Sequence, residues 1–158
     1  MKNPTTLERK SDRELVITRT FNAPAHLVFA AWSTPELIMR WWTPKSFGIT
    51  FVSCEADVRT GGTYRYVFSH PDFDEPMAFF GTYVEVTPHS RIVWTNDESA
   101  DGALSTLTFE EHDGTTLLVL HELYPTTQAL EDSLANGSPT AAGEQFDLLD
   151  DVLATLVH

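Results

Sequence analysis

The chain ends in an amphipathic stretch, from Ser138 to Val157, that limits the folds open to it. Apolar residues recur there at steps of four, three, four and three, which places them on one face of an α-helix. This stripe consists of Ala142, Phe146, Leu149, Leu153 and Leu156, widened by Leu148 and Val152. An apolar stripe of this length must be buried against another element, and we expect a sheet to cover it.

The start and the polar side of this predicted helix can also be located. Ser138 can cap the first turn, and Pro139 suits the first helical position, where a missing N–H has no consequence. The acidic residues fall on the side opposite the stripe, and we expect that side to face water. These residues are Glu144, Asp147, Asp150 and Asp151.

Most of the chain before this helix is predicted to form short strands. Met1 to Arg13 is polar and is expected to be loose, whereas Glu14 to Phe21 is rich in β-branched residues and is predicted to be the first strand. Two short helices follow, each started by a proline, at Ala25–Trp32 and Glu36–Trp41. The further strands are predicted at Ile49–Val58, Thr63–Ser69, Ala78–Val86, Arg91–Thr95, Leu104–Glu111 and Thr115–Leu123, and a candidate short helix at Thr126–Ala135.

The connections between the later strands are of hairpin length, which implies an antiparallel sheet. Asp113-Gly114 is the clearest turn signal, because both central residues of that hairpin turn need positive φ. The expected class is α+β, with a curved antiparallel sheet of about seven strands wrapped around the long C-terminal helix. We expect one domain over residues 1–158, with an ordered core over residues 14–157.

The composition indicates the cellular compartment in which the protein is expected. A chain of 158 residues can bury a sizeable hydrophobic core without covalent cross-links. Its single cysteine, Cys54, excludes an internal disulfide. One cysteine fits a reducing compartment, and we expect the protein to be cytoplasmic. No N-terminal run resembles a signal peptide, and no stretch is long and apolar enough to span a membrane.

The charge is distributed unevenly along the chain. All ten Lys and Arg residues lie at or before Arg91, whereas thirteen of the 23 acidic residues follow it, and the net charge is −13. Binding to nucleic acid or to an anionic membrane surface requires a basic face, so neither is expected. The acidic half indicates a solvated surface that favours solubility, and a docking face for a basic partner is the alternative.

Several local patterns carry a resemblance to a known family. They are Phe21-Asn-Ala-Pro24, Val28-Phe29, Trp32, Thr34-Pro-Glu36, Trp41-Trp42, Asp57–Arg65, Phe80–Glu85 and Arg91–Trp94. In order and spacing they resemble the START-like superfamily, also called the birch-pollen-allergen fold or SRPBCC. More narrowly, they look like the bacterial domains related to the activator of heat-shock protein 90 ATPase.

The resemblance implies a helix-grip fold, in which the sheet holds the C-terminal helix and a cavity lies between them. Members of the superfamily bind lipids, polyketides, plant hormones or flavonoid-like molecules, some are enzymes, and others are chaperone partners. We therefore expect binding of a small hydrophobic or aromatic molecule, and no cofactor. A co-chaperone-like partner of heat-shock protein 90 and a polyketide cyclase-like or hydrolase-like enzyme are the alternatives.

Aromatic residues are the main candidates for the walls of such a cavity. Adjacent helical residues point about 100° apart, so at most one of Trp41 and Trp42 can lie fully in the core, and the other can border the cavity mouth. Alternation puts Tyr64, Tyr66 and Phe68 on one face of a strand, as ordinary core or as cavity wall. The candidate ligand-binding residues are Trp41, Trp42, Tyr64, Tyr66, Phe68, Trp94, Phe109, His121, Phe146 and Leu149.

His121 is the weakest of these candidates. If Leu118 and Leu120 face one side of their strand, His121 faces the other, and a lone strand histidine is usually a structural residue. The loop from His70 to Pro76 crowds acidic residues but lacks the glycine and distal glutamate of a calcium loop, so we expect no metal site. No catalytic nucleophile motif occurs, which favours binding over catalysis.

Overall fold

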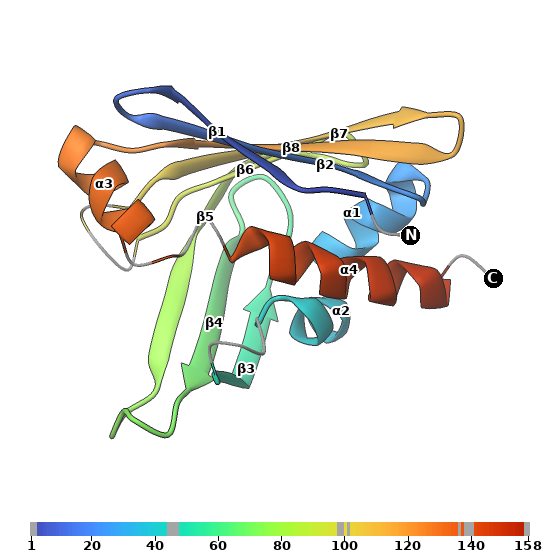
Figure 1. Cartoon of the computed structure of the whole chain (residues 1–158). Coiled ribbons are helices and arrows are strands. Elements are labelled where there is room, and N and C mark those ends of the chain that lie inside the picture. Colours follow the sequence, from blue (N-terminus) through green and yellow to red (C-terminus); the bar gives the residue numbers. More distant parts are fainter. Residues whose placement is uncertain are drawn as a thin grey trace.

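The structure is a computed structural model that describes residues 3–43, 48–97, 100, 102–135, 137 and 141–156. It confirms the α+β fold with an antiparallel sheet and a C-terminal helix (Figure 1). The strands of the described chain are β1 (Thr6–Ser11), β2 (Glu14–Phe21), β3 (Thr50–Ala56), β4 (Thr63–Ser69), β5 (Met77–Thr87), β6 (Arg91–Trp94), β7 (Leu104–His112) and β8 (Thr115–Leu123). The helices are α1 (Ala25–Ser33), α2 (Pro35–Trp41), α3 (Thr127–Ala135) and α4 (Ala142–Leu156).

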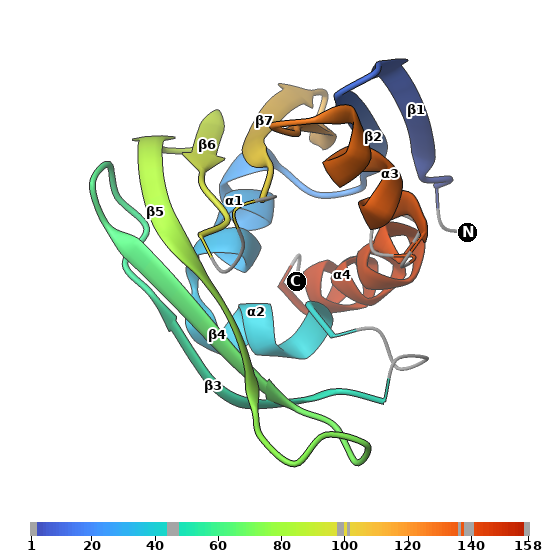
Figure 2. The ribbon, with the colours of Figure 1, turned by 90° about the vertical axis from the view of Figure 1, so that its left-hand side faces the viewer.

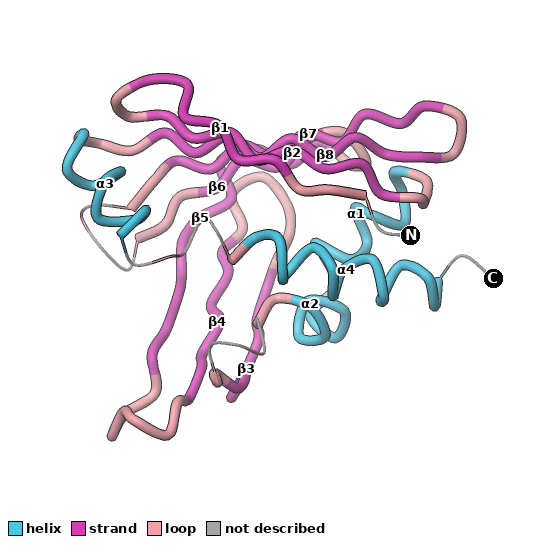
Figure 3. The backbone as a smooth tube through the Cα atoms, viewed as in Figure 1, coloured by secondary structure: helices cyan, strands magenta, loops and turns pink. Residues whose placement is uncertain are grey.

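The sheet runs in the order β1-β2-β8-β7-β6-β5-β4-β3, and every neighbouring pair is antiparallel. It forms two arms at a steep angle, and α2 and α4 lie between them (Figures 1 and 3). In the view of Figure 2 the strands curve around α1, α2 and α4, which is the predicted grip.

The bend of the sheet lies within β5. The part of β5 from Met77 to Thr82 pairs with β4, and the part from Tyr83 to Thr87 pairs with β6. Gly81 sits at the change of partner, where an added Cβ would lie 2.0 Å from the carbonyl oxygen of Thr95. Only glycine allows the two backbones to approach this closely, so Gly81 fixes the position of the bend.

The strand β1 was not predicted, since residues 1–13 were expected to be loose. It pairs with β2 along Thr6↔Thr18 to Arg9↔Leu15 and ends in the turn before Glu14. All six of its residues are exposed. Backbone pairing and exposed side-chain contacts, such as the ion pair of Arg9 with Glu131 of α3, therefore hold this edge strand. A strand with no buried face gives no alternating apolar pattern to recognise.

The apolar stripe of α4 is buried as predicted. Phe146 and Leu149 are 2% and 0% exposed, and both belong to the main core beneath the sheet. Phe146 makes edge contacts with Phe21 of β2 and Trp32 of α1, at ring-centre distances of 5.6 and 6.3 Å. The predicted cap residues Ser138 and Pro139 lie outside the described residues.

The polar side of α4 does not all face water, which corrects the expectation from sequence. Arg19 points inward from β2, its side chain is 1% exposed, and it forms ion pairs with Asp147 and Asp150. The side chain of Asp150 is only 16% exposed, whereas that of Asp147 is 54% exposed. The ion pairs join β2, the strand next to the edge strand β1, to the middle of α4, so α4 is held by charge as well as by its stripe.

The β7–β8 hairpin turn has the predicted geometry, with φ of 53° at Asp113 and 82° at Gly114. We expect Gly114→Ala to lower the free energy of unfolding by about 1–2 kcal/mol, because an L-residue is strained at positive φ. No atom lies within 4 Å of the position of the new Cβ, so the cost is purely conformational. Urea denaturation measures it, and an unchanged midpoint would contradict the turn geometry.

None of the helices in the described part of the chain is both long and apolar enough to cross a bilayer.

Candidate functional site

A cavity of about 480 Å³ lies between the inner face of the sheet, the start of α4 and helix α3. Its apolar wall comes from Ile17, Trp32, Trp42, Phe79, Trp94, Leu120, Ala129, Ala142 and Phe146. Its polar wall comes from Asn96, Ser105, Glu122, Tyr124, Asp132, Ser133 and Gln145. A cavity that is mostly apolar with a few convergent polar groups is the usual form of a small-molecule site.

The cavity exists because the chain forms two separate cores. The main core lies under α1, α2 and α4, and includes Trp32 and Phe146. A smaller core forms where α3 packs on the end of the sheet, with Tyr124 and Leu130 at its centre. Both cores contribute to the cavity wall, since Phe146 belongs to the first and Tyr124 to the second. The space between the two cores is therefore the cavity.

A smaller aromatic hollow of about 30 Å³ adjoins the cavity at Trp32, Trp42, Phe79, Trp94 and Asn96. Its remaining wall consists of Tyr64, Tyr66, Tyr83 and Ile92. The two spaces share one aromatic boundary, so a flat ring in the larger cavity would meet this wall.

The structure assigns different places to the two adjacent tryptophans. Trp41 is 1% exposed, and its indole N–H donates to the carbonyl oxygen of Ala31 at 3.0 Å, so it is a core residue. Trp42 is partly exposed and lines the cavity, with its ring 5.2 Å from that of Tyr66. Gln145 of α4 donates to the carbonyl oxygen of Trp42, at 2.5 Å, and so ties the end of α2 to the cavity wall.

The predicted aromatic row on β4 faces inward, and all three of its residues are buried. Tyr64 and Tyr66 line the smaller hollow. Phe68 is 0% exposed and packs against Phe51 and Phe79, at ring-centre distances of 4.7 and 5.2 Å, away from the cavity. The row is thus partly wall and partly core.

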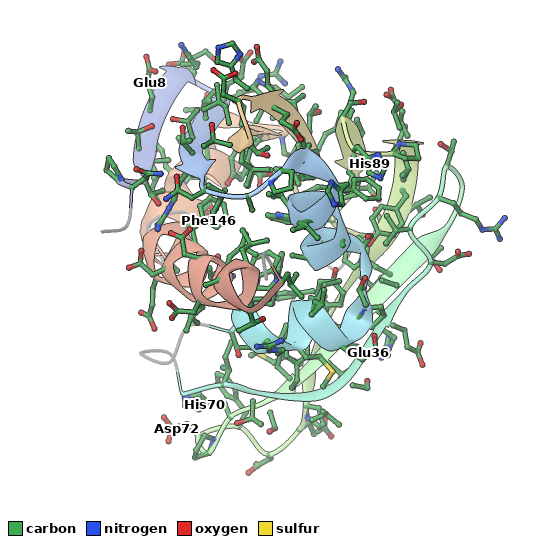
Figure 4. The ribbon with its side chains drawn as sticks, turned by 90° about the vertical axis from the view of Figure 1, so that its right-hand side faces the viewer. Glu8, Glu36, His70, Asp72, His89 and Phe146 are labelled. Carbon is green, nitrogen blue, oxygen red and sulfur yellow. The ribbon has the colours of Figure 1, made fainter. Side chains whose placement is uncertain are left out.

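The cavity and its hollow bring together half of the candidate residues, namely Trp42, Tyr64, Tyr66, Trp94 and Phe146. Trp41, Phe68, Phe109 and Leu149 are buried in the main core instead and line neither space. Phe146 is labelled in Figure 4, where it extends from α4 toward the interior.

His121 lies on the outer face of β8, opposite to the cavity. Its side chain is 36% exposed, and Nε2 lies 3.4 Å from a carboxylate oxygen of Glu14 on β2. The alternation of β8 instead turns Glu122 inward, in line with Leu118 and Leu120. Glu122 is therefore the polar residue that β8 turns into the cavity, and the sequence interpretation passed over it in favour of its neighbour.

A chain of hydrogen bonds leads from Glu122 to the aromatic hollow. The hydroxyl of Ser105 donates to Glu122 Oε2 at 2.5 Å, and Asn96 Nδ2 donates to Ser105 Oγ at 3.0 Å. The other end of Asn96, Oδ1, lies 3.2 Å from the hydroxyl of Tyr64. These groups fix one another's orientation, because each partner restricts the rotation of the next. The cavity thus carries a pre-organised polar strip along one side.

The pKa of Glu122 is raised to about 7, because burial penalises its charged form; the hydrogen bond from Ser105 acts in the opposite direction. In the sheet ladder, Glu122 lies opposite Leu15 on β2 and Ser105 on β7, neither of which is charged. The other titratable groups at this end of the cavity are the carboxyl of Asp132 and the hydroxyl of Tyr124. At neutral pH, Glu122 is thus divided between its neutral and charged forms.

This raised pKa predicts how the protein's stability changes with pH. Between pH 4.5 and about 7 the folded state binds the proton of Glu122 more tightly than the unfolded state does, so stability falls as pH rises. Glu122→Gln removes this loss of stability, and its side-chain carbonyl oxygen can still accept the hydrogen bond from Ser105. We expect the variant to exceed the parent by up to about 3 kcal/mol at pH 8 and to match it at pH 4.

Urea denaturation at both pH values measures this difference, with Glu110→Gln as the matched control. Glu110 is exposed on the outer face of β7, so its replacement should give the same small change at pH 4 and pH 8. A parent protein as stable as Glu122→Gln at pH 8 would show that the Glu122 carboxyl is well solvated.

In the described part of the chain, no group of three or more His, Cys, Asp or Glu side chains is placed to hold a metal ion. His70 and Asp72 lie in the loop between β4 and β5 (Figure 4), and neither lines the cavity. His70 Nδ1 is 3.7 Å from the carboxylate of Asp72, as expected for a local surface pair.

A curved sheet gripping a C-terminal helix over an internal cavity defines the START-like class of α+β domains. Residues 22–154 match the family model described as "Activator of Hsp90 ATPase homolog 1-like protein", and the chain belongs to this family. No curated protein matches the chain.

Solved bacterial structures share the fold over nearly the whole chain. A crystal structure of a Rhodobacter sphaeroides protein has a TM-score of 0.87 and 24% identity, and the match covers 96% of this chain and 99% of that one. A protein from Nitrosomonas europaea has a TM-score of 0.83 and 20% identity, covering 93% and 97%. An AHSA1-like protein from Aeromonas hydrophila has a TM-score of 0.68 and 19% identity, covering 87% and 94%. Likenesses at this level of identity show the fold alone.

Proposed function

We propose that this protein binds a small apolar or aromatic molecule in the cavity between its sheet and α4. The observation that carries the proposal is the cavity itself, which has a volume of about 480 Å³ and a wall of tryptophan, phenylalanine and aliphatic side chains. A ligand in this space would remove apolar wall from water, and each 100 Å² removed contributes about 2.5 kcal/mol before the costs of association.

The aromatic wall supports a flat ring system as the ligand. Trp32, Trp42 and Trp94 converge at the boundary of the cavity and its hollow, with the ring of Trp32 6.1 Å from Trp42 and 6.0 Å from Trp94. Aromatic rings pair best in offset or edge-to-face arrangements at such separations. A planar ligand could contact several of these rings at once.

The two alternatives from sequence have less support. An enzyme would need reactive groups in the cavity, and among the described residues its wall contains neither histidine, cysteine nor lysine. The groups left for acid–base chemistry are then carboxyl and tyrosine hydroxyl groups, with Glu122 and Asp132 as the carboxyls. A heat-shock protein partnership rests on the family description alone.

Isothermal titration calorimetry with naphthylmethanol, a neutral two-ring alcohol, tests the proposal. We expect a dissociation constant in the micromolar range, about −8 kcal/mol, with one molecule bound per chain. Binding should also change the tryptophan fluorescence, since three tryptophans border the cavity. Absence of binding at millimolar probe, in protein purified free of retained small molecules, would contradict the proposal.

A further inference from the structure

The charged groups on the cavity wall all have the same sign. Among the described residues that line the cavity, Glu122 and Asp132 are acidic, and none is lysine, arginine or histidine. The inward-facing arginine of β2, Arg19, is already bound to Asp147 and Asp150 of α4. The described part of the wall therefore offers negative charge and no cation to compensate it.

Glu122 is the acidic group placed to meet a ligand. Its carboxyl lies on the inner face of the sheet, and the hydrogen bond described for it comes from the neutral hydroxyl of Ser105. Its neighbours in the sheet are uncharged, with Leu15 on β2 and Ser105 on β7, and the residue that α4 adds to the polar wall of the cavity is the neutral Gln145. The titratable neighbours, Asp132 on α3 and Tyr124 after β8, can add only negative charge.

The same cavity is lined by three indole rings, from Trp32 on α1 and Trp42 at the end of α2, and from Trp94 on β6, which lies two strands from Glu122 in the sheet. The face of an indole ring attracts cations, with about 0.5–1 kcal/mol at exposed sites and about 2 kcal/mol or more where water is excluded. A carboxylate and several indole rings in one cavity are complementary to an organic cation with a flat apolar body.

We propose that the ligand of this cavity is an aromatic amine in its ammonium form, with the ammonium group at Glu122 and the ring among the tryptophans. The inference rests on the proposed binding function and narrows it to one chemical class. An ammonium group donates hydrogen bonds to a carboxylate, and such charge-assisted bonds are about twice as strong as neutral ones. Carboxylate and phosphate ligands are disfavoured, because they would bring like charge to a buried acid.

Three probes of one shape test the inference: naphthylmethylamine, naphthylmethanol and naphthoate, as the same positional isomer. At pH 8 we expect the amine to bind about tenfold more tightly than the alcohol, and naphthoate to bind more weakly than both. Glu122→Gln should abolish the preference for the amine, so that the amine and the alcohol bind this variant with dissociation constants within about threefold of each other. Glu110→Gln, which removes one outer-face charge, should keep the preference.

A measurement on the parent protein alone keeps the test independent of the variants. Near pH 7 about half of the Glu122 carboxyls hold a proton, since the pKa is raised to about 7. A bound cation favours the charged form, so the amine should release roughly half a proton per molecule bound, and the alcohol none. Calorimetry in two buffers of different ionisation enthalpy measures this release.

The outcomes separate the two proposals. Equal affinities for the amine and the alcohol, or a preference that survives Glu122→Gln, would overturn the ammonium inference and leave the binding function intact. Amine binding without proton release near pH 7 would likewise exclude Glu122 as the contact. Failure of all three probes to bind would contradict the binding function itself.

Discussion

Ala142→Trp is expected to weaken the binding of naphthylmethanol at least about tenfold. Ala142 begins α4, is 5% exposed and lines the cavity, so an indole ring at this position would occupy the space that the ligand needs. Because the added ring enters an existing space rather than a filled core, the free energy of unfolding should stay within about 1 kcal/mol of the parent value.

Ala154→Trp is the matched control for this substitution. Ala154 lies on the same helix but on its exposed side, so the same indole ring should there leave the affinity unchanged. Titration calorimetry and urea denaturation on both variants give the two readings. A loss of more than about 3 kcal/mol in Ala142→Trp, with unchanged affinity for the ligand, would mean that α4 closes a filled core.

The second large effect concerns the buried arginine. Asp150→Asn is expected to lower the free energy of unfolding by about 3 kcal/mol, because it takes a buried charge partner from Arg19. Asp147→Asn is expected to cost less than about 1 kcal/mol, since the side chain of Asp147 is 54% exposed and its pair with Arg19 is screened by water.

Arg19→Met sharpens the comparison, because it removes the buried charge and retains an apolar side chain of similar length. In its background, Asp150→Asn should cost under about 1 kcal/mol, since there is no longer a cation to leave uncompensated. Urea denaturation of the four proteins completes this double-mutant cycle. Equal costs for Asp150→Asn in both backgrounds would show that Arg19 and Asp150 are not coupled.

The fold was largely predictable because its signals are local. The 3.6-residue period of α4, the alternation on β4 and the Asp113-Gly114 turn each depend on neighbouring residues, and the structure confirms them. The missed element, β1 (Thr6–Ser11), has no buried face and so no pattern. The Arg19–Asp150 pair joins residues far apart in the chain, although Arg19 already alternates with the inward-facing Ile17 and Phe21.

The site was predictable only in part, because its position depends on which part of the interior the side chains leave unfilled. Tyr66 and Phe68 face the same side of β4 and are both buried aromatic residues, yet of the two only Tyr66 lines the hollow. Which of them becomes wall depends on packing between different strands, such as that of Phe51 and Phe79 against Phe68, and this packing has no local sequence signal. The inward direction of Glu122 could have been predicted from the sequence, because side chains alternate along a strand and Leu118 and Leu120 face inward.

The most direct test of the binding site is a set of nuclear Overhauser effects between bound naphthylmethanol and the methyl groups of the protein. We predict contacts from the naphthalene protons to Ile17, Leu120 and Ala142, which line the cavity from β2, β8 and α4. Leu117, which is 38% exposed on the outer face of β8, should show none. Contacts to Leu117 without contacts to Ile17, Leu120 or Ala142 would place the ligand outside the sheet and contradict the account.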